Sequence, residues 1–262
     1  MGHQRLGTIP KTKKWTAVVD EVLGGNGLGQ DDIARIAAST LDAAGTALEK
    51  GQSDAGVAYT FFLLSQIALA ARHEDWREAL EGAGITLPPD ASLFDLTLSL
   101  QAAVDRYIAS HARPTDVSEM AQQAAGEALS SLAGSSAMTL FGSGEVHLQA
   151  AIRELSTRKG FSLLGQTFFG RFLSSFLGFY LSRITAKHVG SHALPTVADV
   201  GRFNEGLRAH CQQSARIARD FCGQWYSKTA YMGGIDPAKT TRFMAVALRK
   251  LTRELAKQRA ER

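Results

Sequence analysis

Apolar residues recur every three to four positions along most of the chain. This spacing is the period of an α-helix that buries one face, whereas strands would need apolar and polar residues to alternate, and no convincing alternation occurs. Glycine, proline and helix-capping residues divide the pattern into about nine or ten helices. The expected helices cover roughly 13–23, 32–50, 54–70, 73–80, 92–111, 118–133, 143–158, 160–189, 199–228 and 237 to the end. The sequence therefore predicts an all-α protein, folded as a single large helical bundle.

The segment 161–182 holds six of the chain's thirteen Phe residues. On a helix these fall on one broad side, which must be buried, so we expect this helix at the centre of the bundle. Small side chains recur at every fourth position of the same segment: Gly170, Ser174, Gly178 and Ser182. Residues this small let a second backbone approach closely. The stripe predicts a helix–helix interface, either internal or between subunits.

The segment 161–182 is also long enough to cross a bilayer, and Arg171 is its one charged residue. Several Ser, Thr and Gln residues lower its mean hydropathy, and a central Arg costs about 2.5 to 3.5 kcal/mol on insertion. A buried core helix is therefore favoured over membrane insertion. A membrane-disrupting effector acting through this helix stays an alternative.

Composition narrows the class of protein further. The 262 residues are 45% apolar, which supports a large core, and the net charge is only +4 with acids and bases interspersed. Such a balance does not indicate a broad nucleic-acid-binding field, although a nucleic-acid partner stays open. We divide the chain into a basic arm, 1–14, and one helical domain, 15–262. The arm has no apolar run, so it is not a secretory signal, and we expect a cytoplasmic protein.

Two cysteines, Cys211 and Cys222, stand eleven residues apart. On one helix they share a face but lie about 16 Å apart, which is too far for a disulfide or a shared metal. We expect both thiols to be reduced and buried.

Arg106 and His111 form an R-x4-H spacing, and Arg183 with His188 repeats it. This looks like the motif of the HEPN superfamily of helical ribonucleases, in which Arg and His at a helix end, usually paired across a dimer, cleave RNA without metal. An imidazole suits a general base and a guanidinium suits phosphate binding. Five residues on a regular helix separate the side chains by about 140°, and Tyr107 replaces the family's usual polar residue. Surface ion pairing is therefore favoured, and a metal-independent ribonuclease is the alternative.

Other sites for chemistry are weaker. His188 and His192 have a metal-ligand spacing and His210 precedes Cys211, but Gly190 interrupts the first pair and no carboxylate completes either set. The glycine clusters at 24–29 and 142–144 lack the lysine and hydroxyl of a phosphate-binding loop. We expect no metal and no cofactor, and we assign no catalytic residue.

The last helix is rich in basic residues. Its basic face consists of Arg242, Arg249, Lys250, Arg253 and Lys257. A solvated helix face whose positive end complements the helix dipole is the favoured interpretation, and a contact with phosphate or with an acidic partner is the alternative.

Several short segments together resemble a helical family of bacterial proteins with no known activity. They are Lys13-Lys14-Trp15, Glu119-Met120-Ala121-Gln122, Leu140-Phe141-Gly142, Leu181-Ser182-Arg183 with His188-Val189-Gly190, and Trp225-Tyr226-Ser227-Lys228 with Gly233-Gly234. The similarity runs along most of the chain. It implies a bacterial protein from multi-gene anti-phage defence islands that works with other subunits. The resulting prediction is a non-catalytic interaction subunit that binds other protein chains or a second copy of itself.

Overall fold

The computed structural model describes residues 11–24, 29–137 and 145–260. Within those ranges the chain forms twelve α-helices and no strand. The helices are α1 Lys13–Gly24, α2 Gln30–Ala43, α3 Gly45–Gln52, α4 Ala55–Ala70, α5 Trp76–Gly82, α6 Leu93–His111, α7 Asp116–Ala137, α8 Glu145–Leu155, α9 Arg158–Lys187, α10 Val197–Ser214, α11 Arg216–Tyr231 and α12 Pro237–Ala260. The all-α class is confirmed, with slightly more helices than the nine or ten predicted.

The difference in number comes mainly from two breaks at alanines. Ala44 separates α2 from α3 within the predicted helix 32–50, and Ala215 separates α10 from α11 within 199–228. At Ala215 the amide still bonds the carbonyl of Cys211, at 2.9 Å, so the chain changes direction without losing that hydrogen bond. Gly45 follows Ala44 directly, so the first break has a weak signal in the sequence, whereas Ala215, the best helix former, gives none for the second.

The Phe-rich helix α9 lies at the centre of the fold. Its aromatic side chains Phe161, Phe168, Phe169, Phe172 and Phe176 are all completely buried. The ring of Phe61 on α4 packs against three of them, with centroid distances of 5.2 to 5.8 Å. Helices α7, α10 and α11 make the most extensive contacts with α9. The buried apolar side chains of the described residues form one contiguous cluster around this helix.

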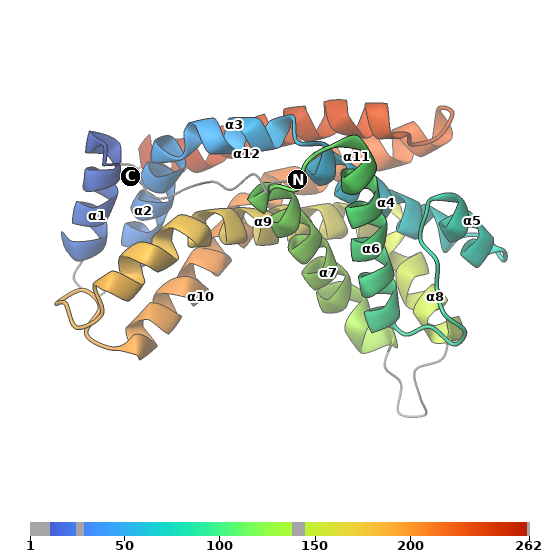
Figure 1. Cartoon of the computed structure of the whole chain (residues 1–262), viewed down its shortest axis with the longest axis horizontal. Coiled ribbons are helices and arrows are strands. Elements are labelled where there is room, and N and C mark those ends of the chain that lie inside the picture. Colours follow the sequence, from blue (N-terminus) through green and yellow to red (C-terminus); the bar gives the residue numbers. More distant parts are fainter. Residues whose placement is uncertain (1–10, 25–28, 138–144, 261–262) are drawn as a thin grey trace.

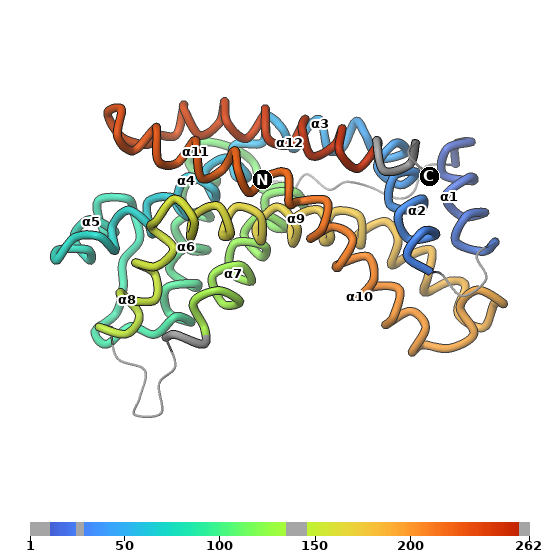
Figure 2. Tube along the Cα trace, turned by 180° about the vertical axis from the view of Figure 1, so that it is seen from behind, coloured from blue at the N-terminus to red at the C-terminus, as the bar shows by residue number. Residues whose placement is uncertain are grey.

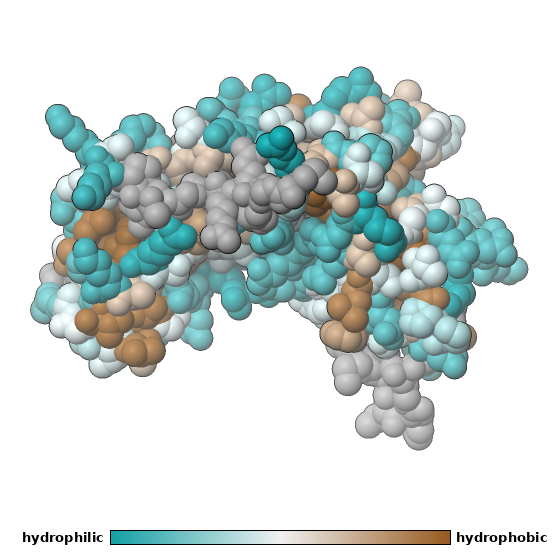
Figure 3. All heavy atoms as spheres, viewed as in Figure 1, coloured by the Kyte–Doolittle hydropathy of each residue, from teal (hydrophilic) through white to brown (hydrophobic). Residues whose placement is uncertain are grey.

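The helices are arranged as an arch (Figures 1 and 2). Helices α3, α4, α11 and α12 run along the top. One leg contains α1, α2, α10 and the C-terminal half of α9, and the other contains α6, α7 and α8. The surface is largely polar along the top, with apolar patches on both legs (Figure 3).

Glycines permit the closest crossings with α9. A Cβ added at Gly165 would stand 2.6 Å from the sulfur of Cys222 on α11, and one added at Gly223 would stand 2.6 Å from the carbonyl oxygen of Arg158. A Cβ at Gly170 would stand 3.0 Å from the Cα of Gln212 on α10. Real side chains do not tolerate such separations. Helices α10 and α11 can therefore approach α9 this closely because glycine has no side chain at these positions.

We predict opposite effects of alanine at two glycines. Gly223→Ala places its methyl group against backbone and is expected to destabilise the fold by about 1 to 3 kcal/mol through overpacking. Gly178→Ala meets nothing within 4 Å and should stabilise α9 by about 0.5 to 1 kcal/mol, because glycine is a poor helix former. Urea unfolding of both variants measures the difference. Equal effects would contradict the packing of α11 on α9.

Candidate functional site

One hollow in the described part of the structure is a groove of about 600 Å³. Helices α1, α3 and α9 and the α6–α7 connection form it. Trp15 and Tyr180 contact each other in its wall, with ring centroids 4.9 Å apart and ring planes tilted by 34°. The other lining residues are Ala43, Ala44, Thr46, Ala47, Lys50, Ser53, Asp54, Ala55, Ala112, Arg113, Thr115 and Val117. This volume is in the range of ligand pockets.

The carboxylate in the groove has a structural role. Asp54 caps α4 by accepting the amide of Val57 at 2.9 Å, and it also accepts the hydroxyl of Thr115 at 2.8 Å. It thereby ties the start of α7 to the start of α4. Lys50 and Arg113 are exposed at the rim, and neither forms an ion pair within the described ranges. The groove thus combines apolar walls with two cations.

The small-residue stripe does not stay on one face of α9. Residues four apart advance by about 40° around an α-helix, so the stripe turns by about 120° between its ends. Gly170 lies against Gln212 of α10, whereas a Cβ at Gly178 would meet nothing within 4 Å. Ser174 and Gly178 are partly exposed and Ser182 is exposed. The stripe therefore begins as an internal contact and ends on the surface.

The exposed end of the stripe belongs to an open strip on α9. We define the open strip as Ser174, Ser175, Gly178, Phe179 and Ser182, all partly or fully exposed. Phe179 joins it to the groove, because its ring makes an edge contact with Tyr180 at 5.2 Å. A strip without charged members thus borders a partly apolar groove, on a helix whose aromatic residues are mostly core.

The side chains of Arg106 and His111 do not converge on one site. Arg106 donates to the carbonyl oxygen of Gly84 at 2.7 Å, which fixes the loop before α6. The His111 ring donates through Nδ1 to the carbonyl of Tyr107 at 3.1 Å and stacks on that tyrosine, with centroids 4.5 Å apart. Tyr107 in turn stacks on Tyr59 at 3.7 Å. Because α6 continues to His111, the separation of about 140° expected for a regular helix is kept.

The second Arg–His pair lies in the other leg of the arch. The guanidinium of Arg183 sits over the ring of Phe179 at 4.7 Å, and His188 is the residue that ends α9. Figure 1 places this end of α9 and α6 in different legs, so one copy of the chain does not bring the two pairs together. The ribonuclease interpretation stays a prediction that would need a second copy.

The histidines and cysteines considered for metal binding are dispersed. No group of three or more His, Cys, Asp or Glu residues suited to a metal is found in the described part of the chain. His192 is exposed in the α9–α10 loop, His210 is partly buried and Cys211 is completely buried. Burial raises the pKa of the Cys211 thiol to about 12 and raises that of Cys222 as well.

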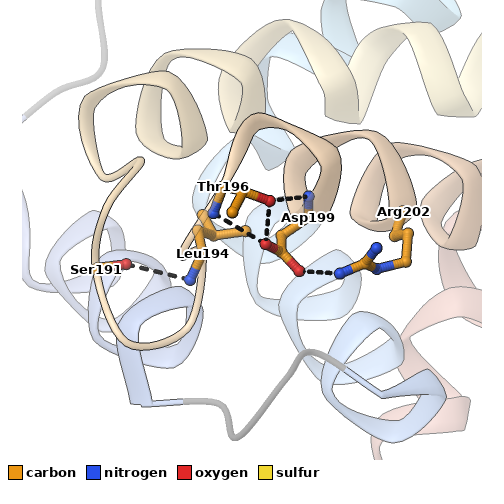
Figure 4. Close-up of polar contacts among 5 residues, drawn as sticks. All are labelled: Ser191, Leu194, Thr196, Asp199 and Arg202. Atoms are coloured by element: carbon orange, nitrogen blue, oxygen red, sulfur yellow. Dashed lines mark hydrogen bonds and ion pairs between the residues drawn. The ribbon is translucent and has the colours of Figure 1, made fainter.

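The α9–α10 loop is held by local hydrogen bonds (Figure 4). Thr196 and Asp199 form a capping box: the Asp199 amide bonds the Thr196 hydroxyl at 3.4 Å, and the Asp199 carboxylate accepts the Thr196 amide at 2.9 Å. Arg202 pairs with the same carboxylate, and the Leu194 amide donates to Ser191 at 3.3 Å. The hydrogen bond from the Thr196 hydroxyl contributes most to lowering the pKa of Asp199. This constellation is structural.

A shallower hollow of about 390 Å³ lies between α7, α9 and α10. Arg171, the charged residue within the Phe-rich segment, reaches it and forms an ion pair with Glu127 of α7 at 3.5 Å. Arg208 and Glu205 line its α10 side. The lining therefore carries two cations and one anion, and one of the cations is already paired with Glu127, which does not favour a charged ligand.

The predicted basic face lies on the outside of α12. Arg242, Arg249, Lys250 and Arg253 are exposed, whereas the side chain of Lys257 lies outside the described part. The Arg249 Nε donates to the carbonyl of Ala245 at 3.1 Å, and the Lys250 ammonium lies 5.2 Å from the centroid of Phe221.

No single helix in the described ranges has both the length and the hydropathy needed to cross a bilayer. The pair α3 and α4 meets these criteria jointly, with a bend of 53° between them. The Phe-rich helix α9 does not meet them.

Comparison of the chain with protein-family models, with curated proteins and with solved structures found no match in any of the three.

We predict that both cysteines resist modification in the folded protein. Thiolate is the reactive form, and burial disfavours it at Cys211 and Cys222. Iodoacetamide at pH about 8 should label both residues in denaturant and neither without it, as read by intact mass. Fast labelling of the native protein would contradict the burial of these thiols.

We predict a pH-dependent contribution of Asp199 to stability. Its pKa is lowered in the folded state, so the ionised cap stabilises α10 above the ordinary Asp pKa of about 3.9, and this contribution is lost as the pH falls through the lower folded value. Asp199→Asn should lower the melting temperature near neutral pH, and the difference should shrink in acid. A difference that does not change with pH would show that the charge has no role.

Proposed function

We propose that this chain is a non-catalytic helical interaction subunit that binds a second protein chain through the open strip of α9 and the adjoining groove. The observation that carries the proposal is Gly178. It lies at a surface-facing point of the central helix, and an added side chain there would meet nothing within 4 Å. Gly201 in α10 is open in the same way. What distinguishes Gly178 is its place in a row of small residues on the central helix, which lets a second backbone approach closely.

The neighbouring groups support a protein partner. No member of the strip is charged, and the one cation in contact with it is Arg183, whose guanidinium lies over the Phe179 ring at the exposed end of the strip. Phe179, which is partly exposed, continues the strip toward the groove, where it packs against the buried pair Tyr180 and Trp15. Large aromatic side chains beside small residues suit the centre of an interface.

Three groups that could carry chemistry contribute to the fold instead. Arg106 holds the α5–α6 loop, Asp54 caps α4, and Cys211 is buried as a thiol. These contacts favour a binding role over an enzymatic one.

The setting of the proposed subunit comes from the resemblance alone. That resemblance implies a bacterial, cytoplasmic protein in a multi-gene anti-phage defence system, in which the partner is another subunit or a second copy of the chain. We include this setting in the proposal because it names the partners to test first, the products of neighbouring genes.

The test compares leucine at two glycines. Gly178→Leu places a branched side chain on the strip, and Gly201→Leu is the matched control, because Gly201 lies in α10 and likewise has nothing within 4 Å of an added Cβ. We expect the wild-type chain to assemble with itself or with a neighbouring gene product. Gly178→Leu should weaken that assembly by about tenfold or more, without lowering the melting temperature, and the control should not.

Native mass spectrometry and light scattering measure the assembly, and calorimetry measures stability. An unchanged assembly with unchanged stability in Gly178→Leu would remove the strip as the interface. A chain that stays monomeric, alone and when co-expressed with each neighbouring gene product, would remove the subunit function itself.

A further inference from the structure

Positive charge is concentrated on the α11–α12 hairpin. Residues 216–260 contain ten basic and three acidic residues, a net charge of +7, whereas the whole chain carries +4. The rest of the chain therefore has nineteen basic and twenty-two acidic residues, a net charge of −3. The net charge of +4 for the whole chain is therefore the sum of a strongly basic hairpin and a slightly acidic remainder.

The exposed basic side chains form a row along α12. Arg242, Arg249 and Arg253 are exposed, and their positions fall within about 40° around the helix axis, about 10 Å and about 6 Å apart along it. Within the described ranges none of the three forms an ion pair. Figure 2 shows α12 along the upper edge with no helix in front of it. We call Lys228, Arg242, Arg249, Lys250 and Arg253 the basic ridge.

The acids of the hairpin do little to neutralise this row. Asp236 caps α12 by accepting the Lys239 amide at 2.7 Å, and it pairs with the Lys239 ammonium at 3.2 Å. Lys239 also donates to the carbonyl of Gly234 at 2.7 Å, so this pair fixes the turn between the helices. The arginines of the ridge are left facing solvent.

An aromatic side chain stands exposed at the end of the hairpin. Tyr231 is 92% exposed and Met232 is 63% exposed, just before Gly233 and Gly234, whose positive φ angles shape the turn. Lys228 is exposed three residues before Tyr231, and so lies on the same side of α11. A free aromatic face next to a row of cations is the combination that binds unpaired bases and their phosphates.

We infer that the basic ridge and Tyr231 bind single-stranded nucleic acid, with the phosphates along α12 and a base stacked on Tyr231. A phosphodiester strand carries one charge at every nucleotide, so it can meet arginines at unequal intervals of about 6 to 10 Å in many registers. An acidic protein would have to place its carboxylates to match that spacing. The exposed tyrosine adds a contact that bases provide and an acidic surface does not. This binding site is separate from the proposed subunit interface on α9.

The experiment measures fluorescence anisotropy of a labelled oligothymidylate of about 20 nucleotides with the full chain. The test variant is Arg242→Gln, Arg249→Gln and Arg253→Gln together. The control is Arg153→Gln, Lys187→Gln and Arg208→Gln together, which removes the same charge from exposed positions on other helices. We expect the test variant to bind about tenfold more weakly or worse, and the control to bind nearly as the wild type does.

The dependence of the oligothymidylate affinity on salt concentration distinguishes direct contacts between the ridge and phosphates from a general effect of the protein's net charge. Each phosphate neutralised on a single strand contributes about 0.7 to the slope of log affinity against log salt, so the test variant should lose about 2 from that slope. Tyr231→Ala should weaken binding by about fivefold or more. Tyr231→Trp, which keeps an aromatic ring at this position, should bind about as tightly as the wild type. Equal binding by the test and control variants would overturn the site.

Competitors decide the class of partner. Displacement of the oligothymidylate by polyglutamate at equal charge concentration would overturn nucleic acid in favour of an acidic protein. Equal affinity for a duplex of the same length would overturn the single-stranded preference and the role of Tyr231. Gly178→Leu should leave the oligothymidylate affinity unchanged, so this test and that of the subunit interface succeed or fail independently.

Discussion

The structure depends on enclosing α9, a helix whose first two thirds are apolar or small on almost every side. A helix of this kind cannot be stabilised by one partner, because each uncovered face would expose phenylalanine to water. Its thirty residues extend about 45 Å, which is longer than any one crossing helix can cover. Helices α7, α10 and α11 therefore pack along it, with Phe61 of α4 against its aromatic rings, and glycines let α10 and α11 approach it closely.

The same constraint explains the break at Ala215. Two straight helices that cross at an angle touch only near the crossing point, so an unbroken helix over 197–231 would diverge from α9 after a few turns. By bending at Ala215, the chain keeps both α10 and α11 against α9, which places Gln212 over Gly170 and Cys222 over Gly165. The packing of α9 thus determines the direction of a segment that its own sequence would leave straight.

Local signals in the sequence predicted much of the fold, and contacts distant in sequence account for the rest. The caps at Asp54, Ser92 and Asp236 stand at the starts of the helices predicted over 54–70, over 92–111 and from 237, because a cap involves residues only three positions apart. No local signal in the sequence predicts the groove. Trp15, Arg113 and Tyr180 come from three distant segments, and their meeting depends on how the helices cross.

The small-residue stripe was read as one face, yet the advance of about 40° per four residues carries it from the core to the surface. Both roles proposed for it, internal contact and contact between chains, are therefore compatible on one helix. Gly170 is required by the fold, and Gly178 is not.

The two proposed binding surfaces differ in position and in chemistry, and this difference has a consequence for how the chain would work. The groove is lined by α3, which lies in front of α12 in Figure 1 and behind it in Figure 2, whereas the basic ridge consists of exposed side chains on α11 and α12. The two surfaces share no residue, so a polyanion on the ridge would not occupy the groove. A chain built in this way can hold a protein partner and a nucleic acid together without needing a conformational change to couple them.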